Sequence, residues 1–156
     1  MLKQEIEKKF KEAVKEKKER EISTLRMLRA AVLEKEREKR CKSIQEGKET
    51  GLSDEEVLQI VMSEIKKRKE SLALFREGKR DDLIRQAEEE IEILKRYLPE
   101  QASAEEIKDL AKEIIKKTGA KEIKDMGRVM PQLMGRLKGR AEGKLVSEVV
   151  RELLSD

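Results

Sequence analysis

The sequence predicts an all-α protein, and three observations carry the prediction. Charged residues make up 46% of the 156 residues and aromatic residues only 2%, a composition typical of long solvated helices. Aliphatic residues recur every three or four positions along most of the chain. Capping motifs, glycines and prolines fall where this apolar pattern breaks. Because the aliphatic residues recur so steadily, the high charge indicates helices rather than disorder.

The first part of the chain predicts two amphipathic helices and a loop. Apolar residues keep helical spacing from residue 2 to about residue 18, and again from residue 22 to about residue 40. Whether these helices are continuous through 17–20 stays open. The polar stretch from Gly47 to Gly51 contains few helix-favouring residues, which predicts a mobile loop.

The middle of the chain predicts an antiparallel pair of long helices. Ser53-Asp54-Glu55-Glu56 matches a capping box and predicts the start of the first. We expect Gly78 to end it in a left-handed conformation. Asp81 or Asp82 is expected to cap the second helix, which Pro99 prevents from continuing. We therefore expect one N-terminal helical lobe over residues 1–98.

The remaining residues, 99–156, predict a compact C-terminal lobe of three helices. Ser103-Ala104-Glu105-Glu106 matches a second capping box, and Gly119 is expected to close the helix that begins there. Asp125 is expected to cap the next helix, and Pro131 should bend or split it. Gly139 and Gly143 frame a turn before the last helix. The two lobes are expected to hinge near residues 99–102.

Composition excludes several kinds of active site. The chain contains no His, so a His-based catalytic triad is excluded, and no phosphate-loop or dinucleotide motif is present. The carboxylates of Asp81-Asp82 and of 88–90 are adjacent in the sequence, so on helices they point in different directions. The single Cys41 has no disulfide partner in the chain and is expected to be an exposed, reduced thiol. We expect no catalytic residues, no metal site and no cofactor.

The sequence also predicts a cytoplasmic location without membrane insertion. The longest apolar runs are 30–33 and 72–75, far shorter than the roughly twenty residues that span a bilayer. The N-terminus carries charges from Lys3 onward and lacks the pattern of a secretory signal.

A basic segment from residue 124 to residue 144 is the strongest candidate binding surface. It contains two acidic residues and six basic ones, Lys124, Arg128, Arg136, Lys138, Arg140 and Lys144. Such a segment suits phosphate groups, and Gly127, Gly139 and Gly143 would let main-chain amides approach them. Composition alone is equally compatible with an ordinary solvated basic face.

Other patterns in this region have two interpretations each. Met126, Met130 and Met134 recur every fourth residue, which indicates either a core face or a stripe for a protein partner. The repeated glycines permit close helix packing or turns. The aromatic residues Phe10, Phe75 and Tyr97 fall on apolar phases, so any RNA recognition would read backbone and shape rather than stacked bases.

Five segments together resemble one bacterial family, the YqeY-like proteins. The segments cover the chain in order and are 23–31 (Ser-Thr-Leu-Arg-Met-Leu-Arg-Ala-Ala), 64–71 (Glu-Ile-Lys-Lys-Arg-Lys-Glu-Ser), 97–99 (Tyr-Leu-Pro), 124–130 (Lys-Asp-Met-Gly-Arg-Val-Met) and 137–146 (Leu-Lys-Gly-Arg-Ala-Glu-Gly-Lys-Leu-Val). The sequence departs from the family pattern at Glu142, where Asp is expected, and at Pro131. Neither departure affects the basic positions.

The resemblance has implications for function. The family is similar to the C-terminal helical and tail region of the B subunit of the glutamine-dependent Asp/Glu-tRNA amidotransferase. In that enzyme the region contacts tRNA, while the chemistry belongs to a separate part that is absent here. A carbon-nitrogen ligase label would be inherited from the larger enzyme. The resemblance therefore implies a non-catalytic tRNA-related binding module, with tRNA or another structured RNA as partner. The alternatives are an accessory component of tRNA-dependent amidation, with amidotransferase subunits as partners, and a helical protein–protein adaptor.

Overall fold

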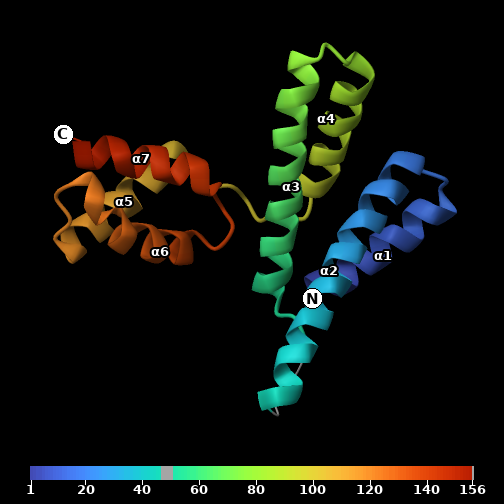
Figure 1. Ribbon diagram of the computed structural model, residues 1–156, viewed down its shortest axis with the longest axis horizontal. Helices are drawn as coiled ribbons and strands as arrows, with labels where there is room; N and C mark the ends of the chain where they lie inside the picture. Colours follow the sequence, from blue (N-terminus) through green and yellow to red (C-terminus); the bar gives the residue numbers. More distant parts are fainter. Residues whose placement is uncertain (47–50, 156) are drawn as a thin grey trace. The chain divides into compact units, whose positions relative to one another are not determined.

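A computed structural model describes the chain over residues 1–46 and 51–155, and the side chains of 44–46 also fall outside that description. The described residues form seven α-helices and one short 3-10 helix and contain no strand, which confirms the all-α prediction. The chain divides into two compact units, Met1–Leu98 and Pro99–Asp156 (Figure 1). Residues 47–50 of the predicted loop lie outside the described residues.

The first unit begins with a helical hairpin. Helix α1 spans Leu2–Lys15 and helix α2 spans Glu19–Glu46, so α2 ends later than the predicted residue 40. The two helices are separate, because Lys17 adopts a left-handed conformation with φ of 56°. They pack side by side after this short turn (Figure 1).

A second hairpin completes this unit, as the sequence predicts. Helix α3 spans Asp54–Glu77 and helix α4 spans Asp81–Lys95. The capping box is complete, since Ser53 Oγ accepts from the Glu56 amide at 3.2 Å and Glu56 Oε2 accepts from the Ser53 amide at 2.7 Å.

The turn between α3 and α4 differs from the prediction in two ways. Gly78 keeps a φ of −78° because its amide still bonds to the Leu74 carbonyl, and the left-handed residue is Lys79, with φ of 51°. Neither aspartate caps α4: Arg80 is its N-cap residue, and Asp82 instead pairs with the Arg80 guanidinium. The left-handed residue that reverses the chain is therefore one position later than the predicted Gly78.

One hydrophobic core joins all four helices of the first unit. Its fully buried side chains include Leu25 and Leu28 of α2, Val57 of α3 and Leu94 of α4. Arg68 of α3 is also buried, and its guanidinium donates to Glu64 and Glu90, each at 2.8 Å. Because a buried charge is tolerated only when it is paired and hydrogen-bonded, this trio links α3 and α4 specifically.

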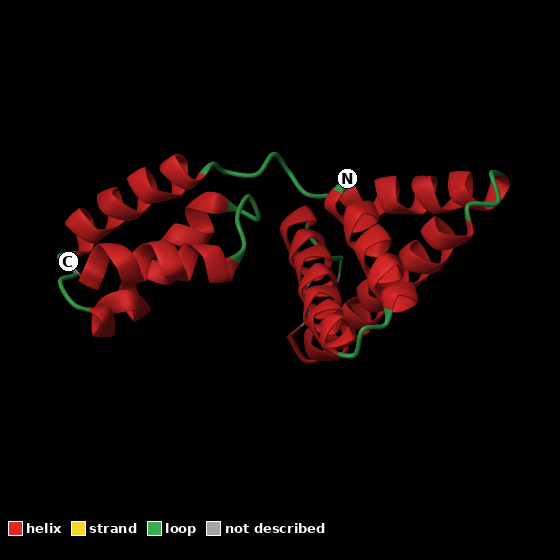
Figure 2. Cartoon of the chain, turned by 90° about the horizontal axis from the view of Figure 1, so that it is seen from above, coloured by secondary structure: helices red, strands yellow, loops and turns green. Residues whose placement is uncertain are grey.

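The second unit is a three-helix lobe with a short 3-10 turn (Figure 2). Helix α5 spans Ala104–Thr118, η1 spans Ile123–Asp125, α6 spans Met126–Leu137 and α7 spans Gly143–Ser155. Its core is a separate cluster that includes Ile107, Val129, Leu133, Leu137, Val146 and Val150. The three methionines at 126, 130 and 134 are partly buried against this core.

Helix ends in the second unit correct two expectations and confirm one. Gly119 closes α5 in the predicted left-handed conformation. Ser103 caps α5, but the reciprocal half of the box is missing because the Glu106 carboxylate bonds to Arg140. Asp125 makes no side-chain bond to the start of α6 and braces the preceding turn.

Helix α6 is not split at Pro131. Proline lacks the amide that would bond to the carbonyl four residues earlier, which is that of Gly127. Both residues are exposed, so water can satisfy this carbonyl and the helix continues.

Candidate nucleic-acid interface

The six predicted basic residues all lie in the second unit, around α6. Lys124 is in η1, and Arg128 and Arg136 lie on the exposed face of α6. Lys138 and Arg140 follow in the α6–α7 turn, and Lys144 is the second residue of α7. The 12 residues of α6 cover roughly 18 Å, so Lys124 before this helix and the three basic residues after it do not form one cluster.

Three of these cations form surface ion pairs. Lys124 lies 2.9 Å from Glu122, Arg128 lies 2.8 Å from Asp125, and Arg136 lies 3.5 Å from Glu113. The three basic side chains are 75%, 58% and 55% exposed. The pairs of Lys124 and Arg136 are exposed on both sides and contribute little stability, so these two cations can exchange a carboxylate for a phosphate at small cost. Asp125, the partner of Arg128, is only 18% exposed.

Lys144 is exposed, and no ion pair or hydrogen bond of its ammonium group occurs among the described residues. It lies at the start of α7, where the first amides of the helix have no helical acceptor. A lysine at this end of a helix opposes the helix dipole, which favours anions there. An anionic ligand would relieve that repulsion.

Arg140 has a different role from the other five. Its guanidinium makes two bonds to the Glu106 carboxylate, at 2.8 and 3.0 Å, and a third to the Glu100 carbonyl at 3.0 Å. Its own carbonyl accepts from the Ala102 amide at 2.7 Å. This pairing holds the pKa of Glu106 below its usual value. Arg140 therefore fastens the chain before α5 to the α6–α7 turn.

Asp125 is a turn-bracing residue that the sequence assigned to a different role. Its carboxylate accepts from the amides of Lys121 and Glu122, at 2.9 and 3.1 Å, and from Arg128 at 2.8 Å. The two amide bonds and Arg128 hold the pKa of Asp125 far below its ordinary range. The carboxylate thus fixes the turn that carries Lys124 and orients Arg128 at the start of α6.

The glycines of this region divide into two kinds. Gly139 has φ of 79° and serves the α6–α7 turn, as the sequence predicts. Gly127 and Gly135 are helical, and apart from its chain neighbours and the backbone of its own helix a Cβ at either would meet no described atom within 4 Å, so neither is needed for close packing there. With Pro131 they form a row of short side chains on the exposed face of α6. A ligand could approach the helix closely along this row.

None of the helices in the described part of the chain combines the length and the apolar character that crossing a membrane requires. No group of three or more acidic or cysteine side chains is placed to hold a metal ion in that part of the chain.

Comparison with known proteins gives the family. The model of the Yqey-like protein family matches residues 3–154 of the 156. An uncharacterized protein of Schizosaccharomyces pombe, C22F3.15, is 41% identical over 51 residues, which is 33% of this chain and 42% of the yeast protein. The chain thus spans less than half of that relative's length. Since the family model covers nearly every residue, the chain belongs to the YqeY-like family.

Proposed function

We propose that the protein is a non-catalytic module that binds structured RNA, with tRNA as the expected class. The proposed contact set comprises the four cations Lys124, Arg128, Arg136 and Lys144. The observation that carries the proposal is their availability: Lys124 and Arg136 have only exposed ion pairs, the Arg128 side chain is 58% exposed beside Asp125, and Lys144 has no ionic partner among the described residues. Arg140 is left out of this set because it is committed to Glu106.

The row of short side chains on the exposed face of α6, called the low row below, supports a polyanion as ligand. Gly127, Pro131 and Gly135 lie beside Arg128 and Arg136 on the same exposed helix face. Short side chains let a phosphate backbone approach while the flanking guanidiniums reach its oxygens. Contacts of this kind read the shape of an RNA and carry little base specificity.

The expectation of tRNA comes from the resemblance to the amidotransferase B subunit. The four cations fall within or beside the segments that carry it, 124–130 and 137–146. If the protein assists tRNA-dependent amidation, it would act by holding tRNA beside amidotransferase subunits. An adaptor that uses the methionine stripe is less well supported, because Met126, Met130 and Met134 pack against the core.

The test compares tRNA binding by three proteins. We expect the variant Lys124→Gln/Arg136→Gln/Lys144→Gln to bind at least roughly tenfold more weakly than wild type near 100 mM salt. The control is Lys8→Gln/Lys11→Gln/Lys15→Gln, which removes three exposed charges of α1 and should bind as wild type does. If four phosphates are neutralised, raising salt from about 50 to 200 mM weakens wild-type binding roughly a hundredfold, with a slope near −3.6. The variant at Lys124, Arg136 and Lys144 keeps one of the four cations and should show a slope near −0.9.

Two results would contradict the proposal. The first is equal binding and equal salt slope for wild type and the variant at Lys124, Arg136 and Lys144, with circular dichroism showing both folded. The second is wild-type binding to an RNA duplex of equal length as tight as to folded tRNA, which would remove tRNA as the expected class.

A further inference from the structure

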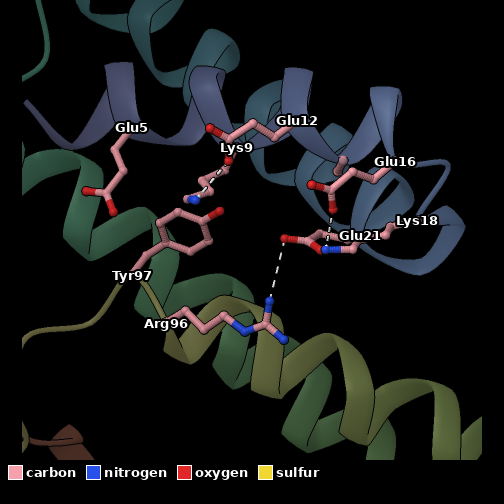
Figure 3. A pocket seen from close by; sticks show the side chains of 9 residues that line it. Glu5, Lys9, Glu12, Glu16, Lys18, Glu21, Arg96 and Tyr97 are labelled. Atoms are coloured by element: carbon pink, nitrogen blue, oxygen red, sulfur yellow. Dashed lines mark hydrogen bonds and ion pairs between the residues drawn. The ribbon is translucent and has the colours of Figure 1, made fainter.

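A cavity of about 260 Å³ lies in the first unit between α1, the start of α2 and the end of α4 (Figure 3). It is distinct from the proposed RNA surface, which belongs to the second unit. Its lining is rich in charge and consists of Glu5, Lys9, Glu12, Ala13, Glu16, Lys18, Glu21, Arg96 and Tyr97. Its size suits a basic side chain or a small amine better than a drug-sized ligand.

Tyr97 contributes an unpartnered hydroxyl to this cavity. The residue is only 8% exposed, and its ring points from the end of α4 toward α1 (Figure 3). Its Oη has no hydrogen bond within the described part of the chain, although buried polar groups are nearly always bonded. Every side-chain nitrogen or oxygen atom that is fully enclosed in the described residues has a hydrogen-bond partner. Since the Tyr97 hydroxyl has none, it is open to solvent. It therefore faces the cavity with an open lone pair.

The carboxylates around Tyr97 are unevenly neutralised. Glu12 pairs with Lys9 at 2.8 Å, and Glu16 pairs with Lys18. Glu21 is only 15% exposed, yet its single ion pair, to Arg96, is long at 3.5 Å. Glu5 has no ion pair among the described residues. The lining thus holds four carboxylates and three cations, and Glu5 and Glu21 are the two carboxylates for which no short ion pair occurs within the described residues.

The same carboxylates act on the tyrosine. Burial first, and then the charges of Glu21 and Glu5, raise the pKa of Tyr97 to about 12. The phenol therefore stays neutral at physiological pH and lies in a negative field. Such a field opposes a phenolate and favours a positively charged ligand.

We propose that this cavity binds the ammonium or guanidinium group of an organic cation between Tyr97, Glu21 and Glu5. The N–H groups of the ligand donate to the phenolic oxygen and to the two carboxylates. Bonds between such a cation and a carboxylate are charge-assisted, and partial burial strengthens them. A small aliphatic polyamine and a basic side chain of another protein share this chemistry.

Tyr97 itself provides the readout, because the chain has one tyrosine and no tryptophan. Tyrosine fluorescence of the RNA-free protein is measured at neutral pH and constant ionic strength, with putrescine, spermidine, butylammonium and methylguanidinium as probes. We expect a saturable change in emission with the cations. The neutral diol 1,4-butanediol, which has the carbon chain of putrescine, should cause none.

Matched variants locate the site. Glu5→Gln should weaken cation binding at least tenfold, and this residue is exposed enough that the fold should persist. Glu21→Gln should have a similar effect, and Tyr97→Phe, followed by calorimetry, should weaken binding as well. The control Glu38→Gln removes an exposed carboxylate of α2 roughly 25 Å along the helix from Glu21 and should bind as wild type does.

The probes also separate the two sources of the cation. Much tighter binding of spermidine and putrescine than of butylammonium would assign the site to a free polyamine. Equal affinities for all single-headed cations would assign it to a basic side chain. The proposal is overturned if the diol changes the emission as the amines do, if no cation gives a saturable change, or if Glu5→Gln and Glu21→Gln both bind as wild type does. None of these outcomes depends on RNA binding.

Discussion

Asp125 and Arg140 each hold one turn of the second unit by contacts that cross several residues. Asp125 binds two amides before η1 and one guanidinium after it. Arg140 binds a carboxylate and a carbonyl that lie 34 and 40 residues away in the chain. Both charged side chains stabilise the backbone conformation of the turn that they bind. The basic side chains nearby therefore extend from ordered turns, which reduces the entropy that binding must overcome.

Asp125 should make the second unit sensitive to acid. Its pKa is far lower in the folded protein than the ordinary value of about 3.8, so its stabilising effect is fully present above that value and is lost as the pH falls below it. Asp125→Asn should lower the melting temperature at pH 7 and narrow the difference between pH 7 and pH 3. Thermal melts followed by circular dichroism measure both.

The matched control for this prediction is Asp109→Asn, which changes an exposed aspartate of α5. It should leave the pH dependence of the melting temperature unchanged. If Asp125→Asn keeps the full wild-type dependence on pH, other carboxylates cause the acid sensitivity and Asp125 is not the brace.

At the scale of the element, local motifs were predictable and long-range partners were not. The capping box at Ser53 could be predicted because both halves lie within four residues. At Ser103 the same pattern predicts only one half correctly, since Arg140, distant in sequence, takes the Glu106 carboxylate. Tyr97 falls on an apolar phase, and nothing in the sequence tells that its hydroxyl lacks a partner. The candidate cavity could therefore be found only from the structure.

Helix α6 contains interior glycines that lower its stability and that its packing does not require. Glycine in a helix interior is about 1 kcal/mol less favourable than alanine. A Cβ at Gly135 meets no described atom within 4 Å beyond its chain neighbours and the backbone of its own helix. Gly135→Ala should therefore stabilise the protein by about 0.5–1 kcal/mol in urea unfolding. If the low row serves RNA, the same variant should bind tRNA more weakly.

The control for Gly135 is Gly139, whose φ of 79° suits alanine poorly. Gly139→Ala should destabilise the protein by about 1 kcal/mol or more. A Gly135→Ala variant that is less stable than wild type would mean that the exposed face of α6 packs against something within the folded chain. If Gly135→Ala is stabilised and binds tRNA as wild type does, the low row does not contact RNA.

At the scale of the whole molecule, the described residues form two hydrophobic cores that share no residue. The first joins α1 to α4 and the second joins α5 to α7. The proposed sites follow the same division, with the cation cavity in the first unit and the RNA surface in the second. A protein built in this way can change one binding surface without rebuilding the other.

We predict that residues 99–156 form a domain that folds without residues 1–98. The segment has its own buried cluster and its own closing contacts, such as the 2.7 Å bond from the Ala102 amide to the Arg140 carbonyl. A unit of this size buries only about 60% of its unfolded surface, so it should be less stable than larger domains yet still unfold cooperatively. The isolated fragment should show a helical circular dichroism spectrum and one thermal transition.

The fragment 99–156 should also retain most of the tRNA affinity of the full chain, because the proposed contacts all lie within it. Residues 1–98 alone should retain the response of Tyr97 to cations. A fragment 99–156 that is unfolded at 20 °C would show that the second core depends on the first unit, and the division into two domains would be wrong.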